Sequence, residues 1–230
     1  MGVKRMVWAK FLNAGQTCIA PDYCIVHSSI KDQFLDLVKQ EIQKANYATD
    51  HDNYVQIINK SNTERIVSFF KNADVFYGGE YNIDERHIAP SILNNVSFDD
   101  PIMDSEIFGP ILPVIEYCDI NELFNELKKK PKPLAAYLFT SQKRDKKKFI
   151  KELPFGGGGI NEVIMQFTNP KLPFGGVGDS GFGSYHGKKG FIAFSHFKSI
   201  IDKPTFFELP LKYSPYSLKK YNIIKRLLKL

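Results

Sequence analysis

The chain has 230 residues, of which 43% are hydrophobic and 24% are charged, and its net charge is +6. This composition is that of an ordinary globular protein, and the length suits one large domain or one and a half. Residues 212–230 carry six positive charges and no acid, which leaves 25 of the 31 basic residues to balance 25 acidic ones. The excess charge therefore belongs to a basic tail, and this distribution argues against a nucleic-acid-binding face.

The cysteine content and the hydropathy pattern indicate where the protein works. Cys18, Cys24 and Cys118 cannot all pair, and their spacing matches no zinc site. Unpaired cysteines are typical of a reducing compartment. No apolar run approaches the roughly 18 to 20 residues that a membrane-spanning helix needs, and the first residues match neither a secretory nor a myristoylation signal. We therefore expect a soluble, cytoplasmic protein without a metal site.

Helix and strand patterns alternate in the first third of the chain. Apolar residues at helical spacing predict a helix over residues 3–16, and residues 21–27 follow as a short strand. Cys18 lies in the turn between them. Capping-box-like patterns at Ser29 and Ser61 predict the starts of two more helices. The apolar stripe predicted for the first of these consists of Ile30, Phe34, Leu37, Val38 and Ile42.

The same alternation continues further along the chain. Residues 111–117 read as a strand, residues 119–129 as a helix, residues 134–140 as a buried strand and residues 142–152 as a strongly basic helix. Strands that alternate with helices predict an α/β fold in which helices flank a largely parallel sheet.

A glycine-rich stretch follows residue 154 and predicts tight turns and close backbone approaches. Within it, residues 176–181 match the pattern G-x-G-x-x-G. A dinucleotide-binding turn of this kind must follow a strand and open an apolar helix. Here Leu-Pro-Phe precedes the glycines, and F-G-S-Y-H-G follows them closely, so a phosphate-binding role is disfavoured.

Several residues are candidates for chemistry, and each also has a plain structural interpretation. Cys18 lies in a turn where a side chain can face a cleft, although a free cysteine is usually a small core residue. Cys24 and Cys118 sit in strand patterns and are expected to serve packing. Glu106, in D-S-E-I-F-G-P, reads by itself as a surface acid at a turn. The five histidines are scattered without metal-ligand spacing.

Three motifs together identify a family. They are N-A-G-Q-T-C-I-A-P-D-Y, E-I-F-G-P-I-L-P-V and L-P-F-G-G-V-G-D-S-G-F-G-S-Y-H-G-K-K-G-F. In this order and at these separations, they resemble the NAD(P)-dependent aldehyde dehydrogenases. The A-P-D-Y and S-Y-H-G-K-K segments resemble the class 3, fatty-aldehyde type. The resemblance implies a catalytic domain over residues 1–200, which leaves residues 201–230 as a basic tail with a short amphipathic helix.

The resemblance also implies roles for single residues. Cys18 matches the catalytic cysteine, Glu106 the acid that holds the nicotinamide ribose hydroxyls, and Phe108 the ring that packs near the nicotinamide. Phe174 and His186 fall in segments that match the substrate-binding region. The implied cofactor is NAD or NADP, and the implied substrate is an aldehyde, of medium or long chain for the fatty-aldehyde type.

This set of residues suits the reaction. A Cys18 thiolate adds to the aldehyde carbon and forms a thiohemiacetal, whose oxyanion needs hydrogen-bond donors such as the Cys18 backbone N–H. Loss of hydride to the cofactor leaves a thioester on Cys18, which an activated water then hydrolyses.

The sequence departs from the family in three respects. The family's water-activating glutamate in an E-L-G-G-K-like segment, its upstream oxyanion asparagine and its N-terminal Rossmann-type domain have no match here. Asn13 lies near Cys18 but does not match that asparagine. We therefore expect a catalytic half that is inactive alone and that works with a separate N-terminal half or belongs to a longer parent protein.

Two other functions stay open at this stage. The chain could be a non-catalytic remnant or interaction subunit of the same fold, or a cysteine-dependent thioesterase that uses a histidine. The last is disfavoured because no motif places a histidine near Cys18. Residues 196–201 match a strand that the family uses between subunits, so a homo-oligomer is expected. The amphipathic helix predicted over residues 217–230 suggests weak contact with a membrane surface.

Overall fold

The computed structural model describes residues 1–47 and 53–228. The chain divides into two compact units, Met1–Phe194 and Ser195–Leu230, which are described separately below.

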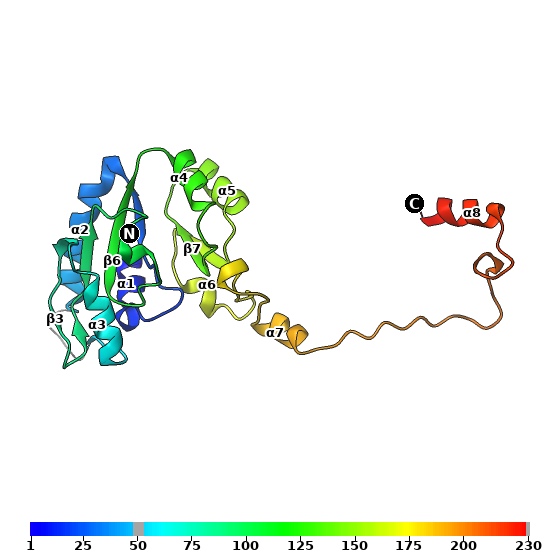
Figure 1. Ribbon diagram of the computed structural model, residues 1–230, viewed down its shortest axis with the longest axis horizontal. Coiled ribbons are helices and arrows are strands. Elements are labelled where there is room, and N and C mark those ends of the chain that lie inside the picture. The colour runs from blue at the N-terminus through cyan, green and yellow to red at the C-terminus, as the bar shows by residue number, and fades with distance from the viewer. Residues whose placement is uncertain (48–52, 229–230) are drawn as a thin grey trace. The chain divides into compact units, whose positions relative to one another are not determined.

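A four-stranded sheet forms the centre of the first unit (Figure 1). Its strands, in spatial order, are β1 (Cys24–His27), β6 (Ile111–Tyr117), β5 (Ser91–Asn94) and β2 (Asp74–Tyr77). The β1–β6 and β6–β5 pairs are parallel, and β2 closes one edge in the antiparallel direction. The prediction of an α/β fold with a largely parallel sheet is therefore confirmed.

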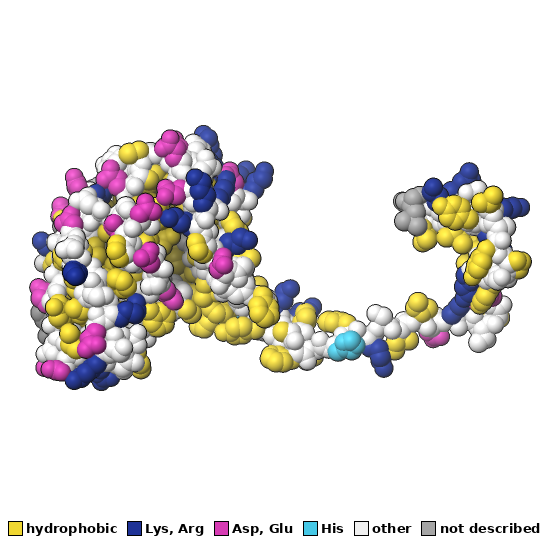
Figure 2. Space-filling model, in the orientation of Figure 1, with side chains coloured by type: hydrophobic (Ala, Val, Ile, Leu, Met, Phe, Trp, Pro, Cys, Tyr) yellow, Lys and Arg dark blue, Asp and Glu magenta, His cyan; other side chains and the backbone are white. Residues whose placement is uncertain are grey.

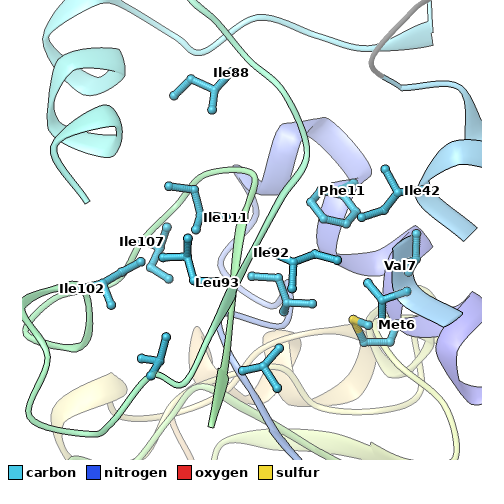
Figure 3. Packing of buried hydrophobic residues seen from close by; sticks show 14 of the residues in the cluster. Met6, Val7, Phe11, Ile42, Ile88, Ile92, Leu93, Ile102, Ile107 and Ile111 are labelled. Atoms are coloured by element: carbon cyan, nitrogen blue, oxygen red, sulfur yellow. The ribbon is translucent and has the colours of Figure 1, made fainter. Parts of the chain in front are cut away.

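Three helices pack with this sheet. They are α1 (Gly2–Phe11), α2 (Lys31–Ala45) and α3 (Lys60–Ser68). The helix α2 lies against both α1 and β1. The main hydrophobic core joins these helices to the strands, and Figure 3 shows Phe11 and Ile42 beside Ile92 in it. Phe11, the last residue of α1, is buried in this core, so apolar packing holds the end of the helix that precedes the Cys18 turn.

A second, smaller sheet lies C-terminal to β6. Its strands β7 (Ala135–Leu138) and β8 (Gly157–Ile160) are parallel, and the helices α4 (Ile120–Leu127) and α5 (Lys143–Glu152) belong to the same segment (Figure 1). A small cluster of buried residues lies beside this sheet and consists of Ala9, Ile19, Val163 and Ile164. Since Ala9 comes from α1, that helix contributes to both cores.

The other elements given for the described residues of the first unit are short. They are the hairpin strands β3 (Tyr81–Asn82) and β4 (His87–Ile88), the helices α6 (Met165–Thr168) and α7 (Gly187–Ala193), and the 3₁₀ turns Leu12–Gly15, Ser28–Ile30, Pro101–Met103 and Gly178–Ser180. The glycine-rich stretch does make the close approaches that its composition predicts. A Cβ atom on Gly156 would clash with the carbonyl oxygens of Leu134 and Gly175.

In residues 195–228, the second unit contains one helix, α8 (Leu218–Leu228), and a 3₁₀ turn at Pro210–Lys212. This helix lies within residues 217–230, for which the sequence predicts an amphipathic helix. The strand expected at 196–201 is not formed in residues 195–228, where those residues are exposed and extended without a paired neighbour. Among the described residues, no helix is long and apolar enough to span a bilayer.

The predicted apolar stripe of α2 was partly wrong. Ile30 is 51% exposed and Leu37 is 40% exposed, whereas Lys31 is buried. The Lys31 ammonium group donates to Asn95 at 2.7 Å and to Glu116 at 3.0 Å. A lysine whose charge meets an acid on the sheet can occupy an inward position, and these partners lie far away in the sequence.

The two predicted capping boxes were also wrong. The helix α3 begins one residue before Ser61, because the Asn59 side chain accepts the Asn62 N–H at 2.8 Å. The chain after Ser29 first forms a 3₁₀ turn, capped by the His27 ring. In each case a polar side chain two or three residues before the donor accepts a free backbone N–H.

Candidate active site

The turn that carries Cys18 follows α1 directly. Asn13, Ala14 and Gly15 have φ values of 55°, 52° and 73°, so the chain leaves the helix through three left-handed residues. A side chain at Gly15 would clash with the carbonyl of Gly109 in the E-I-F-G-P motif. Only glycine tolerates both this φ value and this contact. The first and second sequence motifs therefore meet backbone to backbone, although Gly15 and Gly109 are 94 positions apart in the sequence.

Polar side chains hold the same turn. The Asn13 side chain donates to the Gln16 carbonyl at 3.0 Å, and the Gln16 amide donates back to the Asn13 carbonyl at 3.1 Å. Gln16 also donates to the Gln56 carbonyl at 3.1 Å and accepts the Ile58 N–H at 2.9 Å. The Asn13 amide is thus engaged in fixing the turn, while Cys18 itself is exposed.

The E-I-F-G-P motif is anchored from two sides. The Ile107 N–H donates to Asp22 Oδ1 at 3.1 Å, and Arg65 of α3 donates to the Ile107 carbonyl at 2.7 Å and to the Glu106 carbonyl at 3.4 Å. The Ile107 side chain is fully buried and packs near Ile102 in the core (Figure 3). Asp22 belongs to the A-P-D-Y segment, so one carboxylate couples the cysteine turn to this motif.

Glu106 and Phe108 flank that buried isoleucine and are both exposed. Within the part of the chain that the structure describes, no hydrogen bond occupies the Glu106 carboxylate. Partial desolvation raises the pKa of Glu106, and the Asp22 charge raises it further, whereas Arg65 and Lys10 lower it. The Glu106 carboxylate is carried on an anchored backbone, and its two oxygens are suitable acceptors for two neighbouring hydroxyl groups.

Tyr137 of β7 holds the other side of the cysteine turn. Its hydroxyl donates to the Ile19 carbonyl at 2.8 Å and accepts the Gln166 side-chain N–H at 2.9 Å. Burial raises the pKa of Tyr137, the Gln166 hydrogen bond lowers it, and a charge on Cys18 raises it. The second sheet thus fixes the residue that directly follows Cys18.

Phe174 and His186 lie together in an aromatic cluster. Phe174 pairs with Tyr185 through two backbone hydrogen bonds of 2.9 Å, and its ring stacks on His186 with centroids 5.8 Å apart. Phe167 contacts both Phe174 and His186. Phe174 also packs against the cluster that contains Ile19. The predicted substrate-binding residues are therefore adjacent to each other, and Phe174 is linked to the Cys18 turn.

The other two cysteines differ from one another. Burial raises the pKa of Cys24 to about 12, with Lys10 opposing the shift, so this thiol is unreactive near neutral pH. Cys118 was expected to pack inside a strand, which is wrong: it follows the end of β6 and is exposed. Its thiol lies 3.6 Å from the Ser28 hydroxyl.

The other candidate sites have less structural support. The G-x-G-x-x-G residues form a 3₁₀ turn closed by a bond from the Val177 N–H to Ser180 Oγ at 3.0 Å, and no apolar helix begins there. Across residues 1–47 and 53–228, no group of three or more His, Cys, Asp or Glu side chains is placed to hold a metal ion. Two surface hollows, beside α4 and beside Tyr77, include none of the predicted site residues in their lining.

Sequence reasoning missed the residues that hold the site. Lys10, Arg65, Tyr137 and Gln166 all lie outside the three family motifs. Asp22 was part of A-P-D-Y, and its position shortly after the cysteine was the one signal available.

The family model for the aldehyde dehydrogenase family matches residues 2–200. The chain belongs to the aldehyde dehydrogenase family. It is similar to 4,4'-diaponeurosporen-aldehyde dehydrogenase of Staphylococcus aureus, at 41% identity over 98% of this chain and 50% of the relative. It is also similar to aldehyde dehydrogenase family 3 comG of Dictyostelium discoideum, at 39% identity over 98% of this chain and 49% of the relative.

Solved structures of aldehyde dehydrogenases share the fold. A substrate-bound S. aureus AldH matches with a TM-score of 0.90 and 40% identity, over 99% of this chain and 50% of that one. A Mycobacterium tuberculosis aldehyde dehydrogenase complexed with NAD+ matches in fold, with a TM-score of 0.79 and 23% identity over 90% of this chain and 44% of that one. The predicted family and its class 3 character are thus confirmed. The chain spans about half the length of these relatives.

Proposed function

We propose that this chain supplies two groups of an NAD(P)-dependent aldehyde dehydrogenase: the nucleophile, Cys18, and the acid that binds the nicotinamide ribose, Glu106. The observation that carries the proposal is the joining of the Cys18 turn to the Glu106 motif, through the Gly15–Gly109 backbone contact and the hydrogen bond from Ile107 to Asp22. Relatives named for aldehyde oxidation and for NADP preference support it.

The residues of this chain suit the cofactor. Glu106 and Phe108 are both exposed. The Glu106 carboxylate would accept hydrogen bonds from two ribose hydroxyls, and the Phe108 ring would contact the nicotinamide. The cofactor, when bound, supplies the hydride acceptor that converts a thiohemiacetal to a thioester. Since NAD and NADP share the nicotinamide ribose, these contacts are compatible with either one.

The covalent steps belong to Cys18. Its exposed thiol adds as thiolate to the carbonyl carbon of an aldehyde, and the Cys18 backbone N–H donates to the developing oxyanion. Tyr137 and Gln16 keep the turn in place, which preserves the attack geometry on which such steps depend. Phe174 and the rings around it provide an apolar wall that suits the chain of a medium- or long-chain aldehyde.

No residue of this sequence matches the family's water-activating glutamate or its oxyanion asparagine. Loss of general-base help costs on the order of 10²–10⁴-fold in rate, and loss of one oxyanion donor about 10²–10³-fold. We therefore expect the 230-residue chain to turn over negligibly by itself and to act with the other half of an aldehyde dehydrogenase.

We further propose how the chain associates. A rat relative is named a dimeric NADP-preferring aldehyde dehydrogenase. In the second unit, Phe197 and Ile201 are 75% and 93% exposed, and large exposed apolar groups of this kind mark association surfaces. The proposed partner is a second copy of this chain. Separately, we propose a cytoplasmic location, because the three cysteines are free. A clean monomer mass in light scattering at micromolar concentration would contradict the association.

The tail supports a weaker proposal, contact with an anionic membrane surface. Figure 2 shows hydrophobic and basic side chains together on the C-terminal helix. Tyr221, Leu227 and Leu228 are exposed there, with Lys225 and Arg226 in the last turn. Lys220 donates to the carbonyls of the preceding loop. A basic amphipathic helix of this type binds at the lipid interface.

A labelling experiment tests the main proposal without turnover. Limiting iodoacetamide should modify Cys18 before the other thiols, and nicotinamide mononucleotide should protect it through the Glu106 contact. A Glu106→Gln variant should lose this protection while its Cys18 still reacts. Cys118→Ala is the matched control, because Cys118 is the other exposed thiol. Preferential labelling of Cys118, or protection that is equal in Glu106→Gln, would overturn the assignment.

A further inference from the structure

Lys10 is a buried lysine whose ammonium group contacts the backbone of Asp22. Its side chain is only 1% exposed, and its ammonium nitrogen donates to the Asp22 carbonyl oxygen at 3.1 Å. The carboxylate of the same Asp22 accepts the Ile107 N–H at 3.1 Å. Lys10 thus contacts the backbone of Asp22, and the side chain of Asp22 contacts Ile107, the residue next to Glu106.

A lysine is an expensive choice for this position. Removing an ammonium group from water costs far more than burying a methionine of similar length, unless negative charge lies close by. Lys10 comes from the inner face of α1, between the core residues Ala9 and Phe11. An apolar residue would pack there as well, so packing alone does not explain the charge.

The charges around Lys10 explain it better. Burial lowers the pKa of Lys10, while Asp22, Cys24 and Glu106 raise it in that order. Cys24 has a pKa of about 12 and is neutral near neutral pH, so the two carboxylates are the effective partners. For Glu106, desolvation and then Asp22 raise the pKa, whereas Arg65 and then Lys10 lower it. Glu106 therefore faces one repelling acid and two attracting bases.

We propose that Lys10 is a positioning residue whose buried positive charge offsets the negative charge of Asp22. Asp22 can then hold the turn that carries Glu106 while the Glu106 carboxylate stays ionised. This inference rests on the proposed role of Glu106 in ribose binding. The consequence is chemical: an ionised carboxylate accepts hydrogen bonds at both oxygens, whereas a protonated one has a donor in place of an acceptor site. Two ribose hydroxyls that donate together require the ionised form.

The titration of Glu106 tests this without any cofactor. In protein labelled with ¹³C at the glutamate side-chain carboxyl, the Glu106 signal is assigned by its absence in Glu106→Gln. In Lys10→Met, the Glu106 titration midpoint should shift to higher pH, because an attracting charge is lost. Lys10→Arg should keep the wild-type midpoint. A midpoint that stays unchanged in Lys10→Met would overturn the proposal.

Asp22→Asn should shift the Glu106 titration midpoint in the opposite direction. The asparagine oxygen can still accept the Ile107 N–H, but the repelling charge is gone, so the Glu106 midpoint should shift to lower pH. General loosening of the turn would not move the two variants in opposite directions. Lys31→Met is the matched control: Lys31 is also a buried lysine, but its partners are Asn95 and Glu116, and the Glu106 midpoint should stay constant.

A double variant keeps the test decisive if Lys10→Met does not fold. Lys10→Met/Asp22→Asn leaves no unpaired carboxylate at position 22, and its Glu106 midpoint should lie above that of Asp22→Asn alone. Equal midpoints would contradict a role for the Lys10 charge. The pH dependence of Cys18 protection by nicotinamide mononucleotide should follow the Glu106 titration midpoint of each variant. If protection is absent throughout while the midpoints still move, the proposed cofactor role has failed and the Lys10 inference stands.

Discussion

The Cβ position of Gly15 points at the carbonyl of Gly109, so the cysteine turn and the E-I-F-G-P turn touch through their backbones. This contact fixes the backbone of the cysteine turn against the backbone of the turn that carries Glu106. It also requires φ of +73° at Gly15, which side-chain-bearing residues rarely adopt.

Gly15→Ala should therefore destabilise the protein markedly. The left-handed backbone costs about 1 kcal/mol or more for alanine, and the clash with the Gly109 backbone adds to this cost. Urea unfolding gives the change in free energy. Gly183→Ala is the matched control, since Gly183 has φ of +72° but open space at its Cβ position. Equal losses in the two variants would show that the Gly109 contact carries no energy.

Tyr137→Phe should weaken the support of the cysteine turn. The Ile19 carbonyl loses its donor, and the Gln166 amide loses its acceptor, for a cost of about 1–3 kcal/mol. Alkylation of Cys18 should become less selective because the turn is less fixed. Tyr23→Phe serves as control, because the structure gives the Tyr23 hydroxyl no hydrogen bond among the described residues. Unchanged stability in Tyr137→Phe would argue against this support.

Cys24 should make the protein less stable at alkaline pH. An unfolded thiol ionises near its ordinary pKa of 9.0, whereas the folded thiol ionises near 12. Between these values the native state holds a proton that the unfolded state has released, so stability falls as pH rises through this window. One such proton contributes a slope of about 1.4 kcal/mol per pH unit. Cys24→Ala should remove this part of the slope in unfolding measured from pH 9 to 10.5, with Cys118→Ala as control.

The tail should bind anionic vesicles weakly. Each cation near such a surface contributes about 1 kcal/mol, and salt screens the attraction. Co-sedimentation with phosphatidylserine vesicles should therefore decrease at high salt and in a Lys219→Gln/Lys225→Gln/Arg226→Gln variant. Neutral phosphatidylcholine vesicles provide the comparison. Binding that is equal for the full chain and for a chain lacking residues 212–230 would rule out the tail.

The sequence alone could predict the elements whose pattern is local. The apolar run at residues 111–117 did become one of the two inner strands of the main sheet, and the charged run at 142–152 did become a helix. It could not predict Lys31 facing inward or Asp22 binding Ile107, since each depends on a partner 64 to 85 residues away. Cys118 was misplaced for a similar reason: β6 ends at Tyr117, where its partner β1 ends at His27.

The double role of α1 has a consequence for folding. Its residues Met6, Val7 and Phe11 lie in the main core and Ala9 in the small one, so melting this helix would expose both. The two sheets should therefore unfold as a single cooperative unit, with no stable intermediate that keeps only one of them. Because Cys18 follows α1 within seven residues and is held by Tyr137 of the second sheet, its geometry exists only after both sheets have assembled. A nascent or partly folded chain then carries an ordinary free thiol without an organised site around it.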